Sequence, residues 1–205
     1  MVQILESRRA PRLPAARRDA KRAEILRRAA SLFREQGFHA AGMRELAKAL
    51  GMTPGNLYYY FAGKDDLLYA CQSQALATLL AGARAAARRP GRTSAQRLEE
   101  IVRVHVLCLL EETGGSAAHL EFRGLPGPRR AEIARRRDTY ERLVRGMVAT
   151  GTRRGELRPV DAKLATLALL GALNYTVVWW RPDGDRTPAE IAREFGKTWI
   201  GGLLP

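Results

Sequence analysis

The sequence has few of the residues on which enzymes and secreted proteins depend. Its 205 residues include two cysteines, Cys71 and Cys108, which lie far apart and lack the spacing of a metal site or a disulfide framework. A reducing cytoplasm is the simple interpretation. The three histidines form no catalytic or metal-binding pattern, and neither a phosphate-binding glycine loop nor a nucleophile motif occurs. An enzyme is therefore the least favoured function, and we expect no metal and no cofactor.

Acidic residues are also scarce relative to basic ones. The chain holds 21 Asp and Glu against 35 Lys and Arg, which gives a formal net charge of +14. A polyanionic partner is the first explanation for such an excess. The charge does not identify that partner by itself, because an anionic membrane or an acidic protein would also fit.

No apolar run is long and continuous enough for a confident membrane span. The longest, residues 164–180, is interrupted by Thr166, Gly171, Asn174 and Thr176 and indicates a buried helix. The first residues carry no apolar signal core, because VQIL is followed at once by Glu6 and arginines. Strand-like alternation is not seen anywhere. With 46% hydrophobic residues, the sequence predicts an all-α protein of about nine helices.

The stretch 43–61, MRELAKALGMTPGNLYYYF, has the spacing of a helix-turn-helix. Ala47 lies where two helices must touch, and Gly51 follows four residues later at the turn. Thr53 is a good N-cap and Pro54 suits the first position of a short helix that ends at Tyr60. Such a unit needs a supporting helix, which the apolar stripe within residues 17–36 predicts.

The short helix leaves one face outward once Leu57 and Tyr60 turn in. Asn56 can offer a donor and an acceptor to a base edge, and tyrosine hydroxyls can bond phosphate oxygens. Gly55 weakens a helix, yet it would let the backbone come close to a base or phosphate. The alternative for Tyr58 is ordinary packing with a hydrated hydroxyl. Flanking charge adds to this surface, since Lys64 should lie beside it and residues 1–16 form a basic arm that either follows DNA or is a solvated tail.

The run KRAEILRRAASLFREQGFHAAGMRELAKALGMTPGNLYYYFAGKDDLL resembles the DNA-binding domain of the TetR family of transcriptional regulators. The resemblance covers about residues 18–70 and departs from the family at Gly42, where Thr or Ser usually caps the helix. It implies a DNA-binding domain at 17–63 and a ligand-binding and dimerisation domain at 64–205. It also implies these DNA contacts: Arg44, Thr53, Pro54, Gly55, Asn56, Tyr58, Tyr59 and Lys64.

The last two predicted helices have the apolar character of a dimeric four-helix bundle. A dimer is favoured because one helix-turn-helix unit covers only one half of a DNA site, whereas two units related by a two-fold axis can bind both halves of a palindrome. The alternative is an intrachain core, which some of these positions must serve. The candidate interface residues are Leu167, Leu170, Ala172, Leu173, Ile191, Phe195, Trp199 and Ile200.

The segment LLGALNYTVVWWRPDGDRTPAEIAREF, with the upstream GELRPVDAKLA, is similar to a TetR subgroup that responds to acyl-CoA thioesters, and this resemblance covers roughly residues 130–205. A ligand site would need an apolar cavity with a few polar groups. An arginine strip at Arg123, Arg129, Arg130 and 135–137 could meet a CoA phosphate at the mouth of such a cavity, or could equally be solvated surface. Ordinary packing is the alternative for each single candidate except Asn174, because an amide in the most apolar helix must find a partner. The candidates are His105, Cys108, Glu112, His119, Phe122, Arg123, Tyr140, Asn174, Tyr175 and Trp179.

These patterns predict a cytoplasmic, dimeric repressor that binds a palindromic operator and is released by a small effector, with no membrane association. The alternative is an architectural or constitutive DNA-binding dimer without an effector. A sizeable cavity in the C-terminal part would favour the first hypothesis, and a filled core the second.

Overall fold

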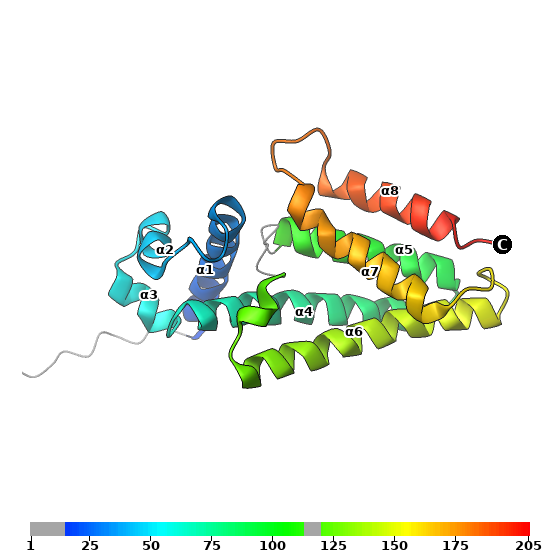
Figure 1. The fold of residues 1–205 in the computed structure, drawn as a ribbon, viewed down its shortest axis with the longest axis horizontal. Helices are drawn as coiled ribbons and strands as arrows, with labels where there is room; N and C mark the ends of the chain where they lie inside the picture. The colour runs from blue at the N-terminus through cyan, green and yellow to red at the C-terminus, as the bar shows by residue number, and fades with distance from the viewer. Residues whose placement is uncertain (1–14, 113–119) are drawn as a thin grey trace, which may run out of the picture.

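The computed structural model describes residues 15–112 and 120–205, and within these ranges every regular element is helical, as expected (Figure 1). Most of the predicted arm at 1–16 therefore lies outside the described residues, and so does His119. The α-helices are α1 (Ala15–Gln36), α2 (Met43–Ala49), α3 (Pro54–Tyr60), α4 (Lys64–Arg88), α5 (Ser94–Leu107), α6 (Gly127–Arg153), α7 (Ala162–Trp179) and α8 (Pro188–Gly201). A π-helical turn, Cys108–Glu112, and a 3-10 turn, Glu121–Gly124, lie between α5 and α6.

Helices α1, α2 and α3 form a head at one end of the molecule (Figure 1). Its turns have the chemistry that the sequence predicted: Gly51 adopts φ +61°, and the Met52 N–H donates to the Ala47 carbonyl at 2.8 Å. A side chain at Gly51 would strain that left-handed backbone. The Thr53 hydroxyl accepts from the Asn56 N–H at 3.2 Å, which caps α3. Helix α3 therefore begins at a fixed place relative to α2.

Helix α4 belongs to two cores at once. Leu67 and Leu68, near its start, pack in the core of the head, whereas Leu79 and Ala83, a few turns later, pack in the core of the body formed by α5–α8. The head core is completed by Ile133 from α6. Because both cores share α4, a shift of this helix in the body must reach the head. The domain boundary at residue 63/64 remains a prediction.

Polar contacts fasten α4 to α6 along the same stretch. The Arg129 guanidinium lies 2.8 Å from the Asp66 carboxylate, and the Tyr69 hydroxyl donates to Glu132 at 2.7 Å. One turn further along, Arg136 donates to the Ser73 carbonyl at 2.9 Å. The bond to Glu132 raises the pKa of Tyr69, which keeps that hydroxyl a donor.

The body is a helical bundle in which α8 packs chiefly on α5 and α6 runs along α4 (Figure 1). Helix α8 begins at a capping box, since Thr187 and Glu190 each bond the other's backbone N–H. The spacing of Thr187 and Glu190 in the run TPAE is the local sequence signal for such a start. Helix α5 has the same device at Thr93 and Gln96.

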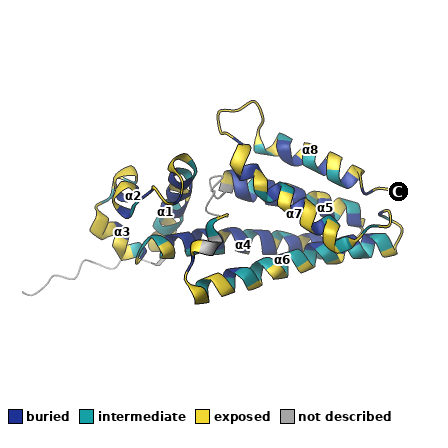
Figure 2. Cartoon of the chain, in the orientation of Figure 1, coloured by how far each residue is buried: buried dark blue, intermediate teal, exposed yellow. Residues whose placement is uncertain are grey.

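Helix α7 has one buried and one exposed apolar side (Figure 2). By length and composition it is the one helix in the described ranges that could cross a membrane, and 33% of it is buried in the protein. Leu173 is 0% exposed and belongs to the body core, together with Leu170 and Ile191. Those three interface candidates serve the intrachain core instead, because their side chains have almost no free surface left. Leu167, at 48% exposed, does offer such a surface.

Candidate nucleic-acid interface and internal pocket

The outer face of α3 carries an exposed polar and aromatic surface. Tyr58 and Tyr59 are 51% and 57% exposed, whereas Leu57, on the inner face, is 0% exposed. Asn56 and Gly55 are exposed as well. A Cβ added at Gly55 would meet nothing within 4 Å, so the fold gives no internal reason for a glycine there. That an external molecule approaches the backbone closely at Gly55 stays a prediction.

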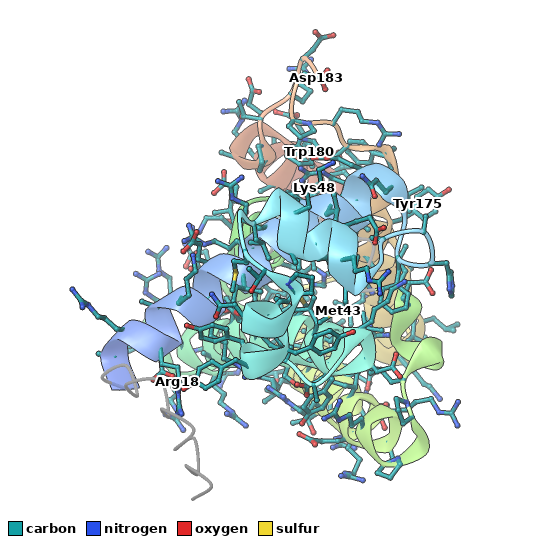
Figure 3. All side chains as sticks on the ribbon, turned by 90° about the vertical axis from the view of Figure 1, so that its left-hand side faces the viewer. Arg18, Met43, Lys48, Tyr175, Trp180 and Asp183 are labelled. Carbon is teal, nitrogen blue, oxygen red and sulfur yellow. The ribbon has the colours of Figure 1, made fainter. Side chains whose placement is uncertain are left out.

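Basic side chains of α1 border this face. A hollow of about 510 Å³ lies between the start of α1 and the end of α3, lined by Arg18, Asp19, Arg22, Tyr59 and Tyr60. Figure 3, which looks onto the head, shows Arg18 at its edge. In the sequence, Arg18 and Arg22 are two of many arginines near the start of α1, and only the packing of α1 against α3 brings them beside the tyrosines.

Arg22 also has a structural role. Its guanidinium donates to the Tyr60 carbonyl at 3.0 Å and lies 4.3 Å from the centre of the Phe61 ring. The end of α3 is thereby tied to α1. Such a cation–π contact contributes about 0.5–1 kcal/mol at an exposed site.

Lys64 lies near the predicted surface but already has partners. Its ammonium donates to the His39 carbonyl at 3.0 Å and lies 4.3 Å from the centre of the Phe38 ring. Burial lowers its pKa. Lys64 therefore braces the loop before α2, and any phosphate contact would be added to this role. Arg44, Thr53 and Pro54 are exposed, as the resemblance implies for DNA contacts.

The body contains a pocket of about 340 Å³ between four helices. Leu76 and Leu79 of α4 and His105 of α5 line it together with parts of α6 and α7. The lining from α6 comprises Arg137, Asp138, Tyr140 and Glu141, and that from α7 comprises Leu167, Leu170, Gly171 and Asn174. Apolar walls with a few convergent polar groups are typical of small-molecule sites, which usually measure roughly 300–1,000 Å³.

Three predicted ligand residues meet in this pocket through a hydrogen-bonded chain. His105 Nε2 lies 3.1 Å from Asn174 Oδ1, and Nδ1 lies 3.1 Å from the Tyr140 hydroxyl. The amide oxygen can only accept, so Nε2 carries the proton and Nδ1 accepts from Tyr140. Burial lowers the pKa of His105 to about 4, which keeps the ring neutral at neutral pH. Asn174, singled out because a buried amide needs a partner, has found one.

Arg137 brings charge to the same pocket. Burial lowers its pKa to about 10, so the guanidinium still carries its charge at neutral pH. The sequence placed Arg137 only within a basic strip. Its neighbours in the strip have other tasks, because Arg129 pairs with Asp66 and Arg136 with the Ser73 carbonyl. The helical phase of α6, not the local charge density, selects the arginine that reaches the pocket.

The other predicted ligand residues lie elsewhere. Cys108 is buried and its thiol donates to the Ala75 carbonyl at 3.6 Å, outside the pocket lining. Tyr175 and Trp179 are 59% and 45% exposed on α7, and Trp179 stacks on Phe195 with ring centres 6.3 Å apart. The side chains of Glu112, Phe122 and Arg123, like His119, are outside the described part of the chain.

Sequence reasoning missed the remaining lining residues. Leu76 and Leu79 fall on the apolar stripe of α4, and Asp138 and Glu141 are ordinary polar positions of α6. No local signal separates them from neighbours that merely pack or face solvent. Their shared position follows from how α4 and α6 pack together.

A short capped helix that packs against a second helix through a tight turn, on a three-helix head, is the arrangement of helix-turn-helix DNA-binding proteins. Residues 25–71 match the model of bacterial regulatory proteins of the tetR family, and residues 91–203 match that of the tetracyclin repressor-like C-terminal domain. The chain belongs to the TetR family. It is a DNA-binding transcriptional regulator and not an enzyme, as the sequence indicated.

Similar proteins span nearly the whole chain. The TetR family regulator PfmR from Thermus thermophilus is 31% identical, with a TM-score of 0.78 over 88% of this chain and 99% of its own. AibR, solved with isovaleryl coenzyme A and operator DNA, is 25% identical, with a TM-score of 0.72 over 90% and 100%. The transcriptional repressor KstR2 of Rhodococcus jostii (strain RHA1) is 26% identical over 91% of this chain and 92% of its own.

Proposed function

We propose that the protein is a cytoplasmic, dimeric repressor that binds a palindromic operator through α3 and is released by a small effector held in the pocket of the body. The observation that carries the proposal is the pairing of two features in one chain. An exposed, capped recognition helix lies at one end, and a pocket with a fixed polar chain lies at the other. Both are joined through α4.

The DNA-binding half of the proposal rests on the surface of α3. Asn56 is the side chain suited to a base edge, since its amide can donate and accept at once. Tyr58 and Tyr59, with Arg18 and Arg22 behind them, suit phosphate and sugar. The net charge of +14 adds a sequence-independent attraction that should weaken steeply with salt.

The effector half rests on the dimensions and chemistry of the pocket. A volume of about 340 Å³ accommodates a short acyl chain and its thioester, whereas the nucleotide of a CoA thioester would have to lie outside. Acyl-CoA thioesters are the first class to test, because the similar protein AibR was solved with isovaleryl coenzyme A. The cavity disfavours the alternative of a constitutive DNA-binding dimer, for which a filled core was expected.

The response to the effector would pass along α4 and α6. Arg137 lines the pocket, and the adjoining Arg136, Glu132 and Arg129 fasten α6 to the part of α4 that enters the head. A ligand can move this pair of helices only if it binds two arrangements with different affinity. The separation of the two heads in a dimer would then change, and with it the fit to two half-sites.

A gel-shift titration with DNA from upstream of the protein's own gene tests the DNA-binding half. We expect a specific complex at moderate salt, with binding that falls as salt rises. Absence of any specific complex from a folded protein would contradict it.

The effector half needs a separate measurement. Short-chain and medium-chain acyl-CoA thioesters are added to the preformed complex, with free coenzyme A as the control. Release by a thioester but not by coenzyme A is the expected result. If mass spectrometry finds no small molecule with the purified protein and no thioester alters the complex, the constitutive alternative is favoured.

A further inference from the structure

A second pocket, lined by arginines, lies where α4 turns into α5, at the end of the body away from the head (Figure 1). The volume of this arginine pocket is about 220 Å³. The charged side chains that line it are four arginines and two glutamates: Arg89, Arg92, Arg97, Arg103, Glu99 and Glu100. Positive charge therefore exceeds negative charge in the arginine pocket.

One glutamate is already paired within the pocket, whereas two arginines are not. Arg103 donates to both carboxylate oxygens of Glu100, at 2.9 and 2.7 Å. These bonds, together with the nearby charges of Arg89 and Arg92, lower the pKa of Glu100, which therefore stays ionised. The guanidinium groups of Arg89 and Arg92 form no hydrogen bond or salt bridge with another described residue. Both are free to bind an anion.

Arg97 is held in place, yet one of its donors is unused. Its Nη2 donates to the Arg89 carbonyl at 3.2 Å, at the C-terminal end of α4. The Nε–H of the same guanidinium is buried and has no acceptor within the described ranges. A buried donor without an acceptor is costly, and the fork of an arginine matches the oxygens of a phosphate group. A bound phosphate would supply the acceptors that Arg89, Arg92 and Arg97 lack.

An apolar groove adjoins the arginine pocket along one face of α5. This α5–α8 groove has a volume of about 470 Å³. Glu99 and Arg103 line both hollows, and Leu107, one turn further along the same face, lines only the groove. A Cβ added to Gly196 would meet nothing within 4 Å, so the groove reaches the backbone of α8 there. The side chains from α8 are Ala189, Ala192, Arg193 and Lys197.

Operator DNA does not account for the arginine pocket. Helix α4 has 25 residues, so its last turn lies roughly 35 Å from Lys64 along the helix. At physiological salt the Debye length is about 8 Å, so the charges at this end are screened from DNA bound at the head. A pocket of about 220 Å³ is also too small for a protein segment of several residues. The occupant that fits is a small anion.

We propose that the arginine pocket and the α5–α8 groove together bind a soluble phosphate or diphosphate ester whose organic part is apolar. The phosphate oxygens accept from Arg89, Arg92 and Arg97, and the organic part lies in the groove against Leu107 and Gly196.

This site is separate from the pocket proposed for the effector. His105, which lines that pocket, is two positions from both Arg103 and Leu107 and is therefore on the opposite side of α5. The second site thus stands or falls independently of the proposed effector.

Isothermal titration calorimetry with inorganic pyrophosphate tests the arginine pocket. A salt concentration of about 0.1 M limits the contribution of charges more than about 10 Å from the ligand. Arg89→Gln combined with Arg92→Gln should weaken binding by about tenfold or more, because two charge-assisted donors are lost. Arg84→Gln combined with Arg88→Gln removes the same charge from exposed positions of α4 outside the lining and should change little. A wild-type protein that does not bind pyrophosphate, or an equal loss in both double variants, overturns the site.

Geranyl diphosphate, which adds an apolar tail to the same diphosphate, tests the groove. We expect the wild-type protein to bind it about tenfold or more tightly than pyrophosphate, because the tail leaves water. Gly196→Leu fills the groove and should remove this gain without changing pyrophosphate binding. Ala189→Leu, at an exposed position of the same wall, is the second variant should Gly196→Leu not fold. Equal binding of both ligands by the wild-type protein overturns the role of the groove.

Flotation with vesicles that contain phosphatidic acid separates a soluble ester from a membrane lipid with the same phosphate chemistry. Protein that stays in solution and binds the soluble esters supports the proposal. Flotation that is abolished by Arg89→Gln with Arg92→Gln would assign the site to a lipid and overturn the soluble ligand.

Discussion

The head and the body distribute polar and apolar groups in opposite ways. In the head, a small apolar core around Leu57 leaves Asn56, Tyr58 and Tyr59 outside. In the body, His105, Tyr140 and Asn174 form a polar chain inside, and α7 turns leucines outward. The first arrangement suits a large polar partner that comes to the surface. The arrangement in the body suits a small ligand in its interior and another protein chain on its surface.

The contrast also shows why net charge was an incomplete guide. The excess of basic residues pointed to a polyanion, and the surface suited to one lies in the head. The pocket of the body is lined largely by uncharged residues, and of the many arginines in α6 only Arg137 lines it. Four measurements test this contrast between the head and the body.

The largest effect is expected on the exposed apolar side of α7, which carries Leu164 and Val178. Leu164→Glu combined with Val178→Glu should weaken self-association about 1,000-fold, since four charges enter one apolar interface and each is costly to bury unpaired. Sedimentation velocity across a concentration series measures the change. Leu204→Glu, at a leucine of similar exposure outside α7, is the control and should change little. Equal effects of both variants would argue against a dimer interface on the exposed side of α7.

The polar chain inside the body should make stability depend on pH. In the folded chain the pKa of His105 is lowered to about 4, against about 6.5 when unfolded, so between these values only the unfolded chain takes up the proton. The wild-type protein should therefore lose up to about 3 kcal/mol through His105 as pH falls from 6.5 to 4, and no such loss occurs above 6.5. Urea unfolding of the wild-type protein and of His105→Gln isolates this contribution as a difference.

His39 provides the matched control for that experiment. Its side chain is 82% exposed, so His39→Gln removes a histidine without opening the body core. A His105→Gln protein with an unchanged slope would show that His105 is not held neutral by the fold.

The polar groups on the outer surface of the head should divide into those that contact base edges and those that contact phosphates. Asn56→Ala should change the ranking of operator variants by about 1–3 kcal/mol at the affected base pair, because it removes a bidentate contact to one base edge. Tyr59→Ala should weaken binding to all variants alike, because phosphate contacts carry no direct sequence information. Competitive fluorescence anisotropy on a panel of single-substitution operators distinguishes the two. An unchanged ranking for Asn56→Ala would exclude it as a base reader.

The smallest effect concerns the glycine in the recognition helix. Gly55→Ala should stabilise the isolated protein by up to about 1 kcal/mol, since alanine is the better helix former and the added Cβ meets open space. If the backbone at Gly55 touches DNA, the same variant should bind its operator more weakly. Thermal unfolding and gel shift together decide the matter. A variant that is more stable and binds equally well would show that no close approach occurs there.

Most features of the head follow from local signals in the sequence. Gly51 at the turn, Thr53 and Pro54 at the start of α3 and the apolar spacing around Leu57 are local signals, and each acts over a few residues. They set the elements and the outward face of α3. The capping box at Thr187 and Glu190 fixed the start of α8 for the same reason. Local chemistry of this kind can be read without knowing what lies across the fold.

Long-range packing of the helices sets which residues share the pocket and which side of α7 stays exposed. Helix α7 carries leucines on both its inner and its outer side, so its sequence could not separate Leu173, which is buried, from Leu164, which is exposed. The arginines of α6 are adjacent in the sequence, and helical phase alone directs Arg137 inward. His105 and Asn174 lie 69 residues apart and meet because α5 and α7 pack together. Long-range packing follows from how helices fit one another, which no local pattern encodes.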